Sequence, residues 1–152
     1  MIVILSLCLV GSSYRSASNY YIEVDFSKPS TEKRFFIYKD NKLVCSTYVA
    51  HGINSGDILA THFSNRINSH ESSLGYYRTL NGYYGHNGYS IKIWGISRTN
   101  SNAYIRKVVI HGANYIGNGK IGHSFGCFAI PTDIAKEWLP KIPSGTIIYA
   151  HI

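Results

Sequence analysis

A histidine and a cysteine joined by a glycine-rich segment are the residues of this chain best suited to chemistry. His111 closes the strand-like run 107–110 (KVVI), and Cys127 ends the segment 124–127 (SFGC). A thiol becomes a strong nucleophile when a histidine or main-chain N–H groups favour its thiolate and depress its pKa. Histidine also exchanges a proton readily near neutral pH. The pair therefore predicts a cysteine nucleophile with a histidine base, acting in acyl transfer.

The residues that flank Cys127 predict a turn that stabilises developing negative charge. Gly126 permits a tight turn in which the N–H groups of Gly126 and Cys127 face an oxyanion. Ser124 has two candidate roles, a hydrogen bond to the acyl donor or a cap on the turn. The base needs an acceptor for its second ring nitrogen, and no Asp or Glu occurs between His111 and Ile130.

Both segments resemble the signature of the L,D-transpeptidase catalytic-domain family, whose members cross-link peptidoglycan stem peptides through a cysteine. In one branch of that family, R-x-I-V-I-H-G-A-x-Y is followed by G-R-S-x-G-C-P-A-[IV]-P. The chain reads RKVVIHGANY at 106–115 and GHSFGCFAIP at 122–131. The similarity extends from about Tyr21 to the C-terminus, so it covers nearly the whole chain.

The resemblance implies a fold and a set of site residues. The fold would be mostly β (α+β), a β-sandwich-like catalytic domain with short helices and long cleft loops. Cys127 would attack the carbonyl between the L-centre of a diamino acid and a D-alanine, with His111 as the base and the Gly112 carbonyl orienting its ring. Matching upstream residues would line the substrate cleft: His51, Asn54, Ser55, Gly56, Ser64, Asn65 and Ser73.

The chain departs from the family pattern at four positions. His123 stands where the branch has arginine, and Phe128 where it has proline. The wider family usually has histidine between Ser and Gly and arginine two residues after Cys, where this chain has Phe125 and Ala129. The lost arginine removes one expected contact for a substrate carboxylate. At the position of the branch's arginine, His123 is the candidate cationic or donor contact to substrate.

Four functions remain open from the sequence. Transfer of the acyl group to an amine would make the protein an L,D-transpeptidase, and transfer to water an L,D-carboxypeptidase. A non-catalytic basic module that binds the cell wall is the alternative from another class, and a general cysteine peptidase is a weaker one.

Composition narrows the class of partner. The chain has 152 residues, a net charge of +7 and 13 tyrosines, which is typical of one β-rich globular domain with an acidic partner. Lys and Arg are scattered and no RNA-binding motif occurs, so we expect the anionic wall and no nucleic acid. His and Cys lack metal-ligand spacing, so we expect no metal and no cofactor. The sequence carries no signature of oligomeric state.

The organisation of the chain predicts a leader followed by one catalytic domain. Residues 1–18 contain a nine-residue apolar run, too short to span a membrane, and are predicted to be a signal or leader segment, with a buried first strand as the alternative. Residues 19–152 would form the catalytic domain, acting outside the cytoplasm. We expect Cys8 to be inert and Cys45 to be a small buried hydrophobe.

The elements that must position the site follow from local patterns. Strands are predicted at 20–26, 34–39, 43–50, 89–94, 107–111 and 146–152. The second and third of these should form a hairpin around 40–42. A helix should begin at Thr132 and end before Pro140. Residues 51–88 are predicted to be long irregular loop, a usual place for functional residues.

Overall fold

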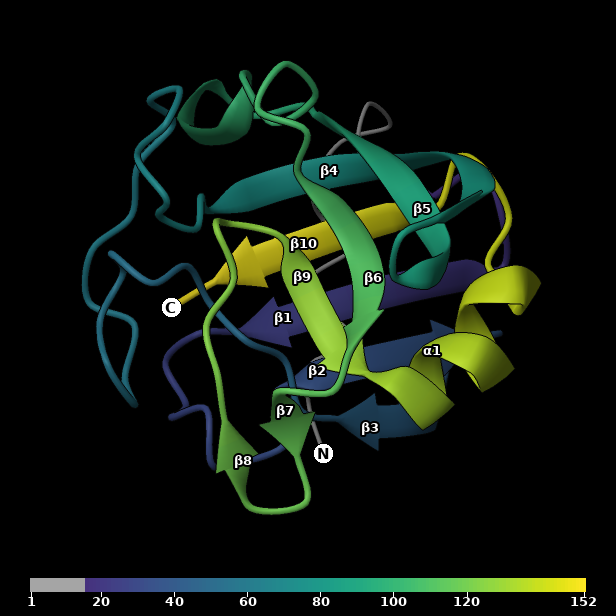
Figure 1. The fold of residues 1–152 in the computed structure, drawn as a ribbon. Helices are drawn as coiled ribbons and strands as arrows, with labels where there is room; N and C mark the ends of the chain where they lie inside the picture. Colours follow the sequence, from purple (N-terminus) through teal and green to yellow (C-terminus); the bar gives the residue numbers. More distant parts are fainter. Residues whose placement is uncertain (1–15) are drawn as a thin grey trace.

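One mixed β-sheet dominates the computed structural model, which describes residues 16–152 (Figure 1). Its strand order is β3-β2-β1-β10-β4-β5-β6-β9. The expected leader and Cys8 lie outside the described residues, apart from residues 16–18. The strands are β1 (Tyr20–Asp25), β2 (Phe35–Lys39), β3 (Lys42–Thr47), β4 (Gly75–Gly85), β5 (Gly88–Gly95), β6 (Val109–Ala113), β9 (Phe128–Pro131) and β10 (Ile147–His151).

Small elements complete the fold. Helix α1 (Thr132–Trp138) follows β9 directly and continues into a 3₁₀ turn, Leu139–Lys141. A second 3₁₀ turn, Arg98–Asn100, follows β5, and the short hairpin of β7 (Ile116–Gly117) and β8 (Lys120–Ile121) connects β6 to the turn before Cys127. The expected mostly-β fold with short helices and long loops is confirmed.

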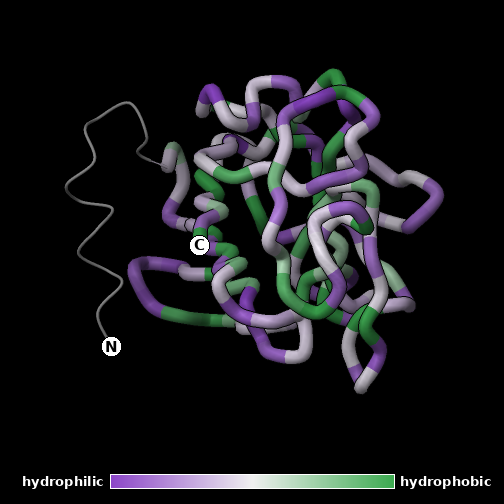
Figure 2. Tube along the Cα trace, turned by 90° about the vertical axis from the view of Figure 1, so that its left-hand side faces the viewer, coloured by the Kyte–Doolittle hydropathy of each residue, from purple (hydrophilic) through white to green (hydrophobic). Residues whose placement is uncertain are grey.

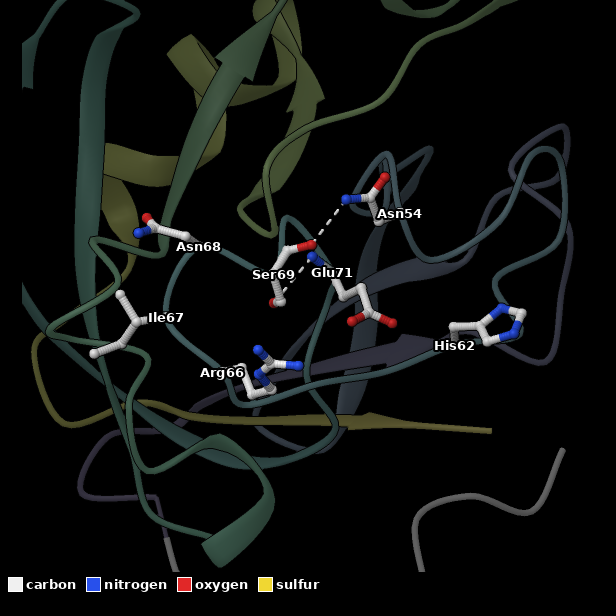
Figure 3. Close-up of a pocket in the computed structure, with 7 residues that line it drawn as sticks. All are labelled: Asn54, His62, Arg66, Ile67, Asn68, Ser69 and Glu71. Atoms are coloured by element: carbon white, nitrogen blue, oxygen red, sulfur yellow. Dashed lines mark hydrogen bonds between the residues drawn. The ribbon is translucent and has the colours of Figure 1, made fainter.

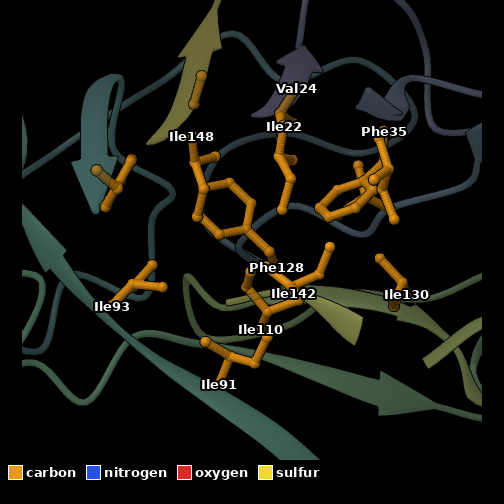
Figure 4. Close-up of a cluster of buried hydrophobic side chains, with 14 of the residues drawn as sticks. Ile22, Val24, Phe35, Ile91, Ile93, Ile110, Phe128, Ile130, Ile142 and Ile148 are labelled. Atoms are coloured by element: carbon orange, nitrogen blue, oxygen red, sulfur yellow. The ribbon is translucent and has the colours of Figure 1, made fainter. Parts of the chain in front are cut away.

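The sheet curls on itself, and its core lies between the two halves. Ile22 of β1 and Ile148 of β10 face Ile91 of β5 and Ile110 of β6, and each is at most 1% exposed (Figure 4). These β-branched side chains alternate with outward residues, as a half-buried strand requires. In Figure 2 the hydrophilic residues concentrate on the outer loops. This packing holds β6 and β9 at fixed positions.

The chain beyond β3 closes the sheet against β9. The Ala50 N–H donates to the carbonyl of Ala129 at 2.9 Å, and the Ser124 N–H donates to the carbonyl of His51 at 3.0 Å. The predicted cleft segment beginning at His51 is thereby brought against the turn that carries Cys127. Residues far apart in sequence meet here because the two edges of the sheet meet.

Three predicted boundaries are wrong. Strand β4 occupies 75–85, inside the stretch predicted to be loop. Its pattern is hidden because the pairing register with β5 shifts between Thr79 and Gly82, so inward and outward residues stop alternating. Strand β6 starts at Val109 because Lys107 adopts a left-handed conformation with φ of 59°. Residues 51–74 keep the irregular character that was expected, whereas residues 48–50, predicted as strand, lie beyond the end of β3 at Thr47.

Candidate active site

His111 is held in one tautomer on the outer face of β6. Its neighbour Ile110 points into the core, so strand alternation turns the imidazole to the opposite face. Nδ1 lies 2.9 Å from the Gly112 carbonyl oxygen. A carbonyl only accepts, so Nδ1 carries the proton and the lone pair is on Nε2. Burial lowers the pKa of His111, which keeps the ring neutral and able to take a proton.

Helix α1 fixes the carbonyl that orients His111. It packs so closely on Gly112 that a Cβ added there would lie 3.0 Å from the Ala135 Cβ and 3.2 Å from the Thr132 Cα. A side chain at Gly112 would require the helix to move by a few tenths of an ångström. The close packing restrains the peptide plane whose oxygen accepts the Nδ1 proton, so the helix supports the tautomer.

Cys127 precedes β9 and shares the outer face with His111. Strands β6 and β9 run parallel, and Phe128, like its partner Ile110, points into the core. Cys127, one residue earlier, therefore points outward. The Val109 N–H donates to Sγ at 3.4 Å, and Sγ lies 3.6 Å from the Lys107 carbonyl oxygen. Within residues 16–152 no direct hydrogen bond joins Sγ to His111 Nε2, as is common before substrate binds.

The thiol is neutral in the free protein, contrary to the expectation of a depressed pKa. Cys127 stays partly exposed, yet the surrounding protein desolvates it and raises its pKa. The Val109 N–H and the charge of Arg106 act in the opposite direction but do not overcome burial. At neutral pH the pair is therefore a thiol beside a neutral imidazole, and the thiol proton must move when the thiol attacks.

The turn before Cys127 is built around Ser124. Its Oγ accepts from the Gly126 N–H at 3.1 Å and donates to the Cys127 carbonyl at 2.8 Å, so the hydroxyl caps the turn. Of the two amides expected to face an oxyanion, that of Gly126 is engaged within the turn. The Cys127 N–H has no acceptor among the described residues. Gly126 itself has φ of +116°, and a Cβ there would lie 2.8 Å from the Glu71 carbonyl oxygen.

Arg106 is a site residue that reasoning on sequence spacing missed. Its guanidinium donates to the Ser64 carbonyl at 3.0 Å, the Glu71 carbonyl at 2.6 Å and the Ser69 hydroxyl at 3.1 Å. Its Nη2 is 3.0 Å from the place of a Gly126 Cβ, so the charge lies directly beside the turn. The arginine thus anchors the loop that contains Ser64, Ser69 and Glu71, and its charge acts to lower the pKa of the Cys127 thiol.

Removing the Arg106 charge should make Cys127 less reactive. We expect Arg106→Met to slow alkylation of Cys127 by about three- to tenfold at pH 8, because the thiolate loses a nearby cation. The rate should reach its half-maximum at a higher pH than in wild type. Iodoacetamide labelling followed by peptide mass spectrometry across pH 6–10 measures both effects.

Two variants separate charge from loop anchoring. Arg106→Lys keeps the charge but loses the forked hydrogen bonds, so it should restore most of the labelling rate. Arg98→Met removes an exposed charge elsewhere and should leave the profile unchanged. Equal slowing by the methionine and lysine variants at position 106 would assign Arg106 to loop structure alone.

His51 holds the long loop in place from inside the protein. The ring is fully buried; Nδ1 accepts from the Arg34 guanidinium at 2.9 Å, and Nε2 donates to the Gly56 carbonyl at 2.9 Å. Ser55 is buried as well, and its Oγ accepts from the Ser72 N–H at 2.8 Å. These three cleft candidates, His51, Ser55 and Gly56, therefore shape the loop through contacts with the protein itself.

Further cleft candidates fasten the long loop to its neighbours. Asn65 donates to the Ser101 hydroxyl at 2.9 Å and accepts from the Asn102 N–H at 2.8 Å. Ser73 is buried, with its hydroxyl 2.7 Å from that of Tyr77. The Ser64 carbonyl accepts from Arg106, as described above. These three residues match the family sequence, and each makes hydrogen bonds that hold the loop to its neighbours.

Asn54 is the cleft candidate that borders a pocket. This pocket of about 430 Å³ is lined by Asn54, His62, Arg66, Ile67, Asn68, Ser69 and Glu71 (Figure 3). The Asn54 amide donates to the Ser69 carbonyl at 2.9 Å across its rim. Cys127 and His111 are not among the lining residues. Arg106, which lies beside the turn of Cys127, donates to the Ser69 hydroxyl and to the Glu71 carbonyl of this lining.

His123 and Phe125 face the long loop from the other side. His123 Nε2 donates to the Asp57 carbonyl at 2.9 Å, and its ring lies 5.3 Å from that of His51. Phe125 is exposed and stacks on His70 with ring centroids 4.2 Å apart. In the free protein the Nε2 hydrogen bond of His123 thus goes to the loop.

Several other features of the described residues bear on the site. Cys45 and Cys127 are free thiols, so they form no disulfide with each other. Across residues 16–152 the structure has no cluster of three or more His, Cys, Asp or Glu side chains able to hold a metal. Over the same residues, no helix has the length and apolar character needed to cross a membrane.

Comparison with known proteins identifies the domain. The family described as "L,D-transpeptidase catalytic domain" matches residues 6–151. No curated protein sequence matches the chain.

Solved structures share the fold. A mutant L,D-transpeptidase of Enterococcus faecium is 18% identical with a TM-score of 0.58, over 88% of this chain and 50% of that one. The L,D-transpeptidase of Xylanimonas cellulosilytica is 17% identical with a TM-score of 0.53, over 90% of this chain and 62% of that one. L,D-transpeptidase 3 of Mycobacterium tuberculosis, solved with a faropenem-derived adduct, is 12% identical with a TM-score of 0.58, over 88% of this chain and 60% of that one. The chain thus spans between half and two thirds of these proteins.

Proposed function

The chain belongs to the L,D-transpeptidase catalytic-domain family, and on that premise we propose that it transfers acyl groups from peptidoglycan stem peptides through a thioester on Cys127. One observation carries the proposal. The hydrogen bond from His111 Nδ1 to the Gly112 carbonyl leaves Nε2 unprotonated on the sheet face that also bears Cys127. A neutral base and a thiol on neighbouring strands are the minimum that cysteine acyl transfer requires.

The first half of the reaction forms the acyl-enzyme. Cys127 Sγ attacks the carbonyl that joins the diamino acid to D-alanine, and its proton passes to His111 Nε2. The oxygen of the tetrahedral intermediate becomes negative, and the Cys127 N–H donates a hydrogen bond to it. Collapse breaks the C–N bond, and His111 returns the proton to the amine of the departing D-alanine. A thioester on Cys127 remains.

The second half releases the acyl group. An amine of a second stem peptide attacks the thioester carbonyl while His111 takes the proton from its nitrogen. The C–S bond breaks, the proton passes to Sγ, and a new amide forms the cross-link. If water is the acceptor, the same steps give a free carboxylate and the protein is an L,D-carboxypeptidase.

The basic character of the chain suits an anionic polymer. Its net charge of +7 favours association with the carboxylates and phosphates of a bacterial wall. Such a substrate lies outside the cytoplasm, so we propose that the protein acts in the periplasm or the cell wall.

Product analysis tests the proposal. On incubation with purified tetrapeptide muropeptides, we expect free D-alanine together with a cross-linked dimer, both measured by liquid chromatography and mass spectrometry. Formation of tripeptide without dimer would assign the protein as a carboxypeptidase. If neither product forms while the muropeptides bind, the non-catalytic wall-binding module is the correct alternative.

A further inference from the structure

The sheet face that bears Cys127 continues across β6 onto β5. Lys92 is the direct partner of Val109 in the antiparallel pairing of β5 and β6. Partners in such a pair point to the same face. The Val109 N–H in turn contacts Cys127 Sγ. The nucleophile therefore looks out onto a surface formed by neighbouring strands β9, β6 and β5 (Figure 1).

An aromatic platform occupies the far side of this surface. Trp94 lies two residues after Lys92 and so shares its face, while the alternate residues Ile91 and Ile93 point into the core. Trp94 is 51% exposed, and it packs against Tyr104, 46% exposed, with ring centroids 5.6 Å apart. We call Trp94 and Tyr104 the aromatic platform. Beside it, the Lys92 ammonium lies 5.5 Å from the centre of the Tyr83 ring.

Packing in the core does not account for the two aromatic side chains of the platform. An indole that keeps half of its surface in water contributes little to the core, and neighbouring exposed aromatics commonly mark a binding surface. Tryptophan and tyrosine rings stack on the apolar C–H faces of sugar rings, while their N–H and O–H groups reach the hydroxyls. The chemistry of the platform fits a carbohydrate.

The separation from Cys127 fits the length of a stem peptide. Trp94 is two strands away from Cys127, about 10 Å across the sheet, and two residues, about 7 Å, further along β5 than Lys92, so about 12 Å separates the two positions. In a tetrapeptide that loses its last residue, three residues precede the scissile carbonyl, and these span at most about 10 Å when extended. The opposite end of that peptide is attached to the glycan.

We propose that Trp94 and Tyr104 bind a sugar ring of the glycan strand that carries the donor stem. The protein would therefore act on stems attached to glycan in preference to free peptides. This inference rests on the proposed acyl transfer by Cys127. It adds a carbohydrate site on β5 and on the turn before β6, outside the residues that carry out the chemistry.

A matched pair of substrates tests the site. For the wild-type protein we expect the KM for a disaccharide-tetrapeptide to be about tenfold lower than that for the same tetrapeptide without sugar. Trp94→Ala should raise the first KM to the level of the second and leave the second unchanged. Tyr104→Ala should act in the same direction.

Tyr84→Ala is the control, because Tyr84 is an exposed aromatic of β4 that packs on Tyr89, away from the platform. It should keep the full preference. Equal effects of Trp94→Ala on both substrates, or no effect on either, would overturn the carbohydrate site. A change in oligomeric state on Trp94→Ala would instead assign the platform to contact between two copies of the chain.

The experiment separates the two proposals. Turnover of both substrates with equal KM in wild type would contradict the carbohydrate site and leave the acyl-transfer proposal intact. Absence of turnover or thioester with either substrate would contradict the proposed function itself.

Discussion

Replacing Cys127 with alanine is expected to abolish turnover of tetrapeptide stems, a loss of about 10³-fold or more. No other group of the described site is placed to form the covalent bond to the acyl group. The variant should fold, because alanine fits the position and the turn is held by the Ser124 hydroxyl and by the main chain of Gly126. Product formation and thermal unfolding of the variant measure the two halves of this expectation.

Cys45→Ser is the matched control for the thiol. Cys45 lies in β3 and packs against the core, and burial raises the pKa of its thiol. Its replacement should leave activity near the wild-type level and cost about 1 kcal/mol of stability, since a hydroxyl takes the place of a partly buried thiol. If Cys45→Ser inactivated as fully as Cys127→Ala, the single-nucleophile account would be wrong.

Replacing His111 with glutamine should lower the rate of acylation by about 10²- to 10⁴-fold. The thiol is neutral in the free protein, so attack requires a base at the moment of bond formation. Glutamine occupies a similar volume but cannot accept the proton. Alkylation of Cys127 at neutral pH should slow as well. Single-turnover release of D-alanine and iodoacetamide labelling give the two rates.

The pH profile adds an independent check on His111. The active form of the base is neutral, and burial lowers the pKa of His111 below its usual value of about 6.5. As pH falls, the ring therefore stays neutral to below 6.5, and activity is lost only when it is finally protonated. An acidic limb of kcat/KM centred above 6.5, or one that persists in His111→Gln, would contradict the assignment.

The segments that contain His111 and Cys127 could be predicted from the sequence because their features depend on adjacent residues. His111 follows a short buried run, and Gly126 beside Cys127 indicates a turn; both features depend on adjacent residues. The strands at 20–25, 35–39 and 147–151 were predictable for the same reason, since apolar and β-branched residues mark them. The position of the His111 ring beside the Gly112 carbonyl was reached only through the family resemblance.

The other features of the site could not be predicted, because they depend on contacts between segments that are distant in the sequence. His51 looks like a cleft residue until Arg34, seventeen residues earlier, is found to hold its ring inside the protein. The pKa of Cys127 depends on burial by the surrounding fold and on Arg106, which the turn after Asn100 folds back onto the site. The position of Trp94 on the face that bears Cys127 follows from the pairing of β5 with β6, and no short sequence motif predicts that register.

The most direct test of the account is intact-protein mass spectrometry after brief mixing with a tetrapeptide stem and quenching in acid. The account predicts a mass increase equal to the tripeptide acyl group, released by hydroxylamine as a thioester is, and located on the peptide that contains Cys127. The adduct should be absent from Cys127→Ala and present in Cys45→Ser. Free D-alanine released without any adduct on Cys127, or an adduct that survives in Cys127→Ala, would contradict the claim that this cysteine is the nucleophile.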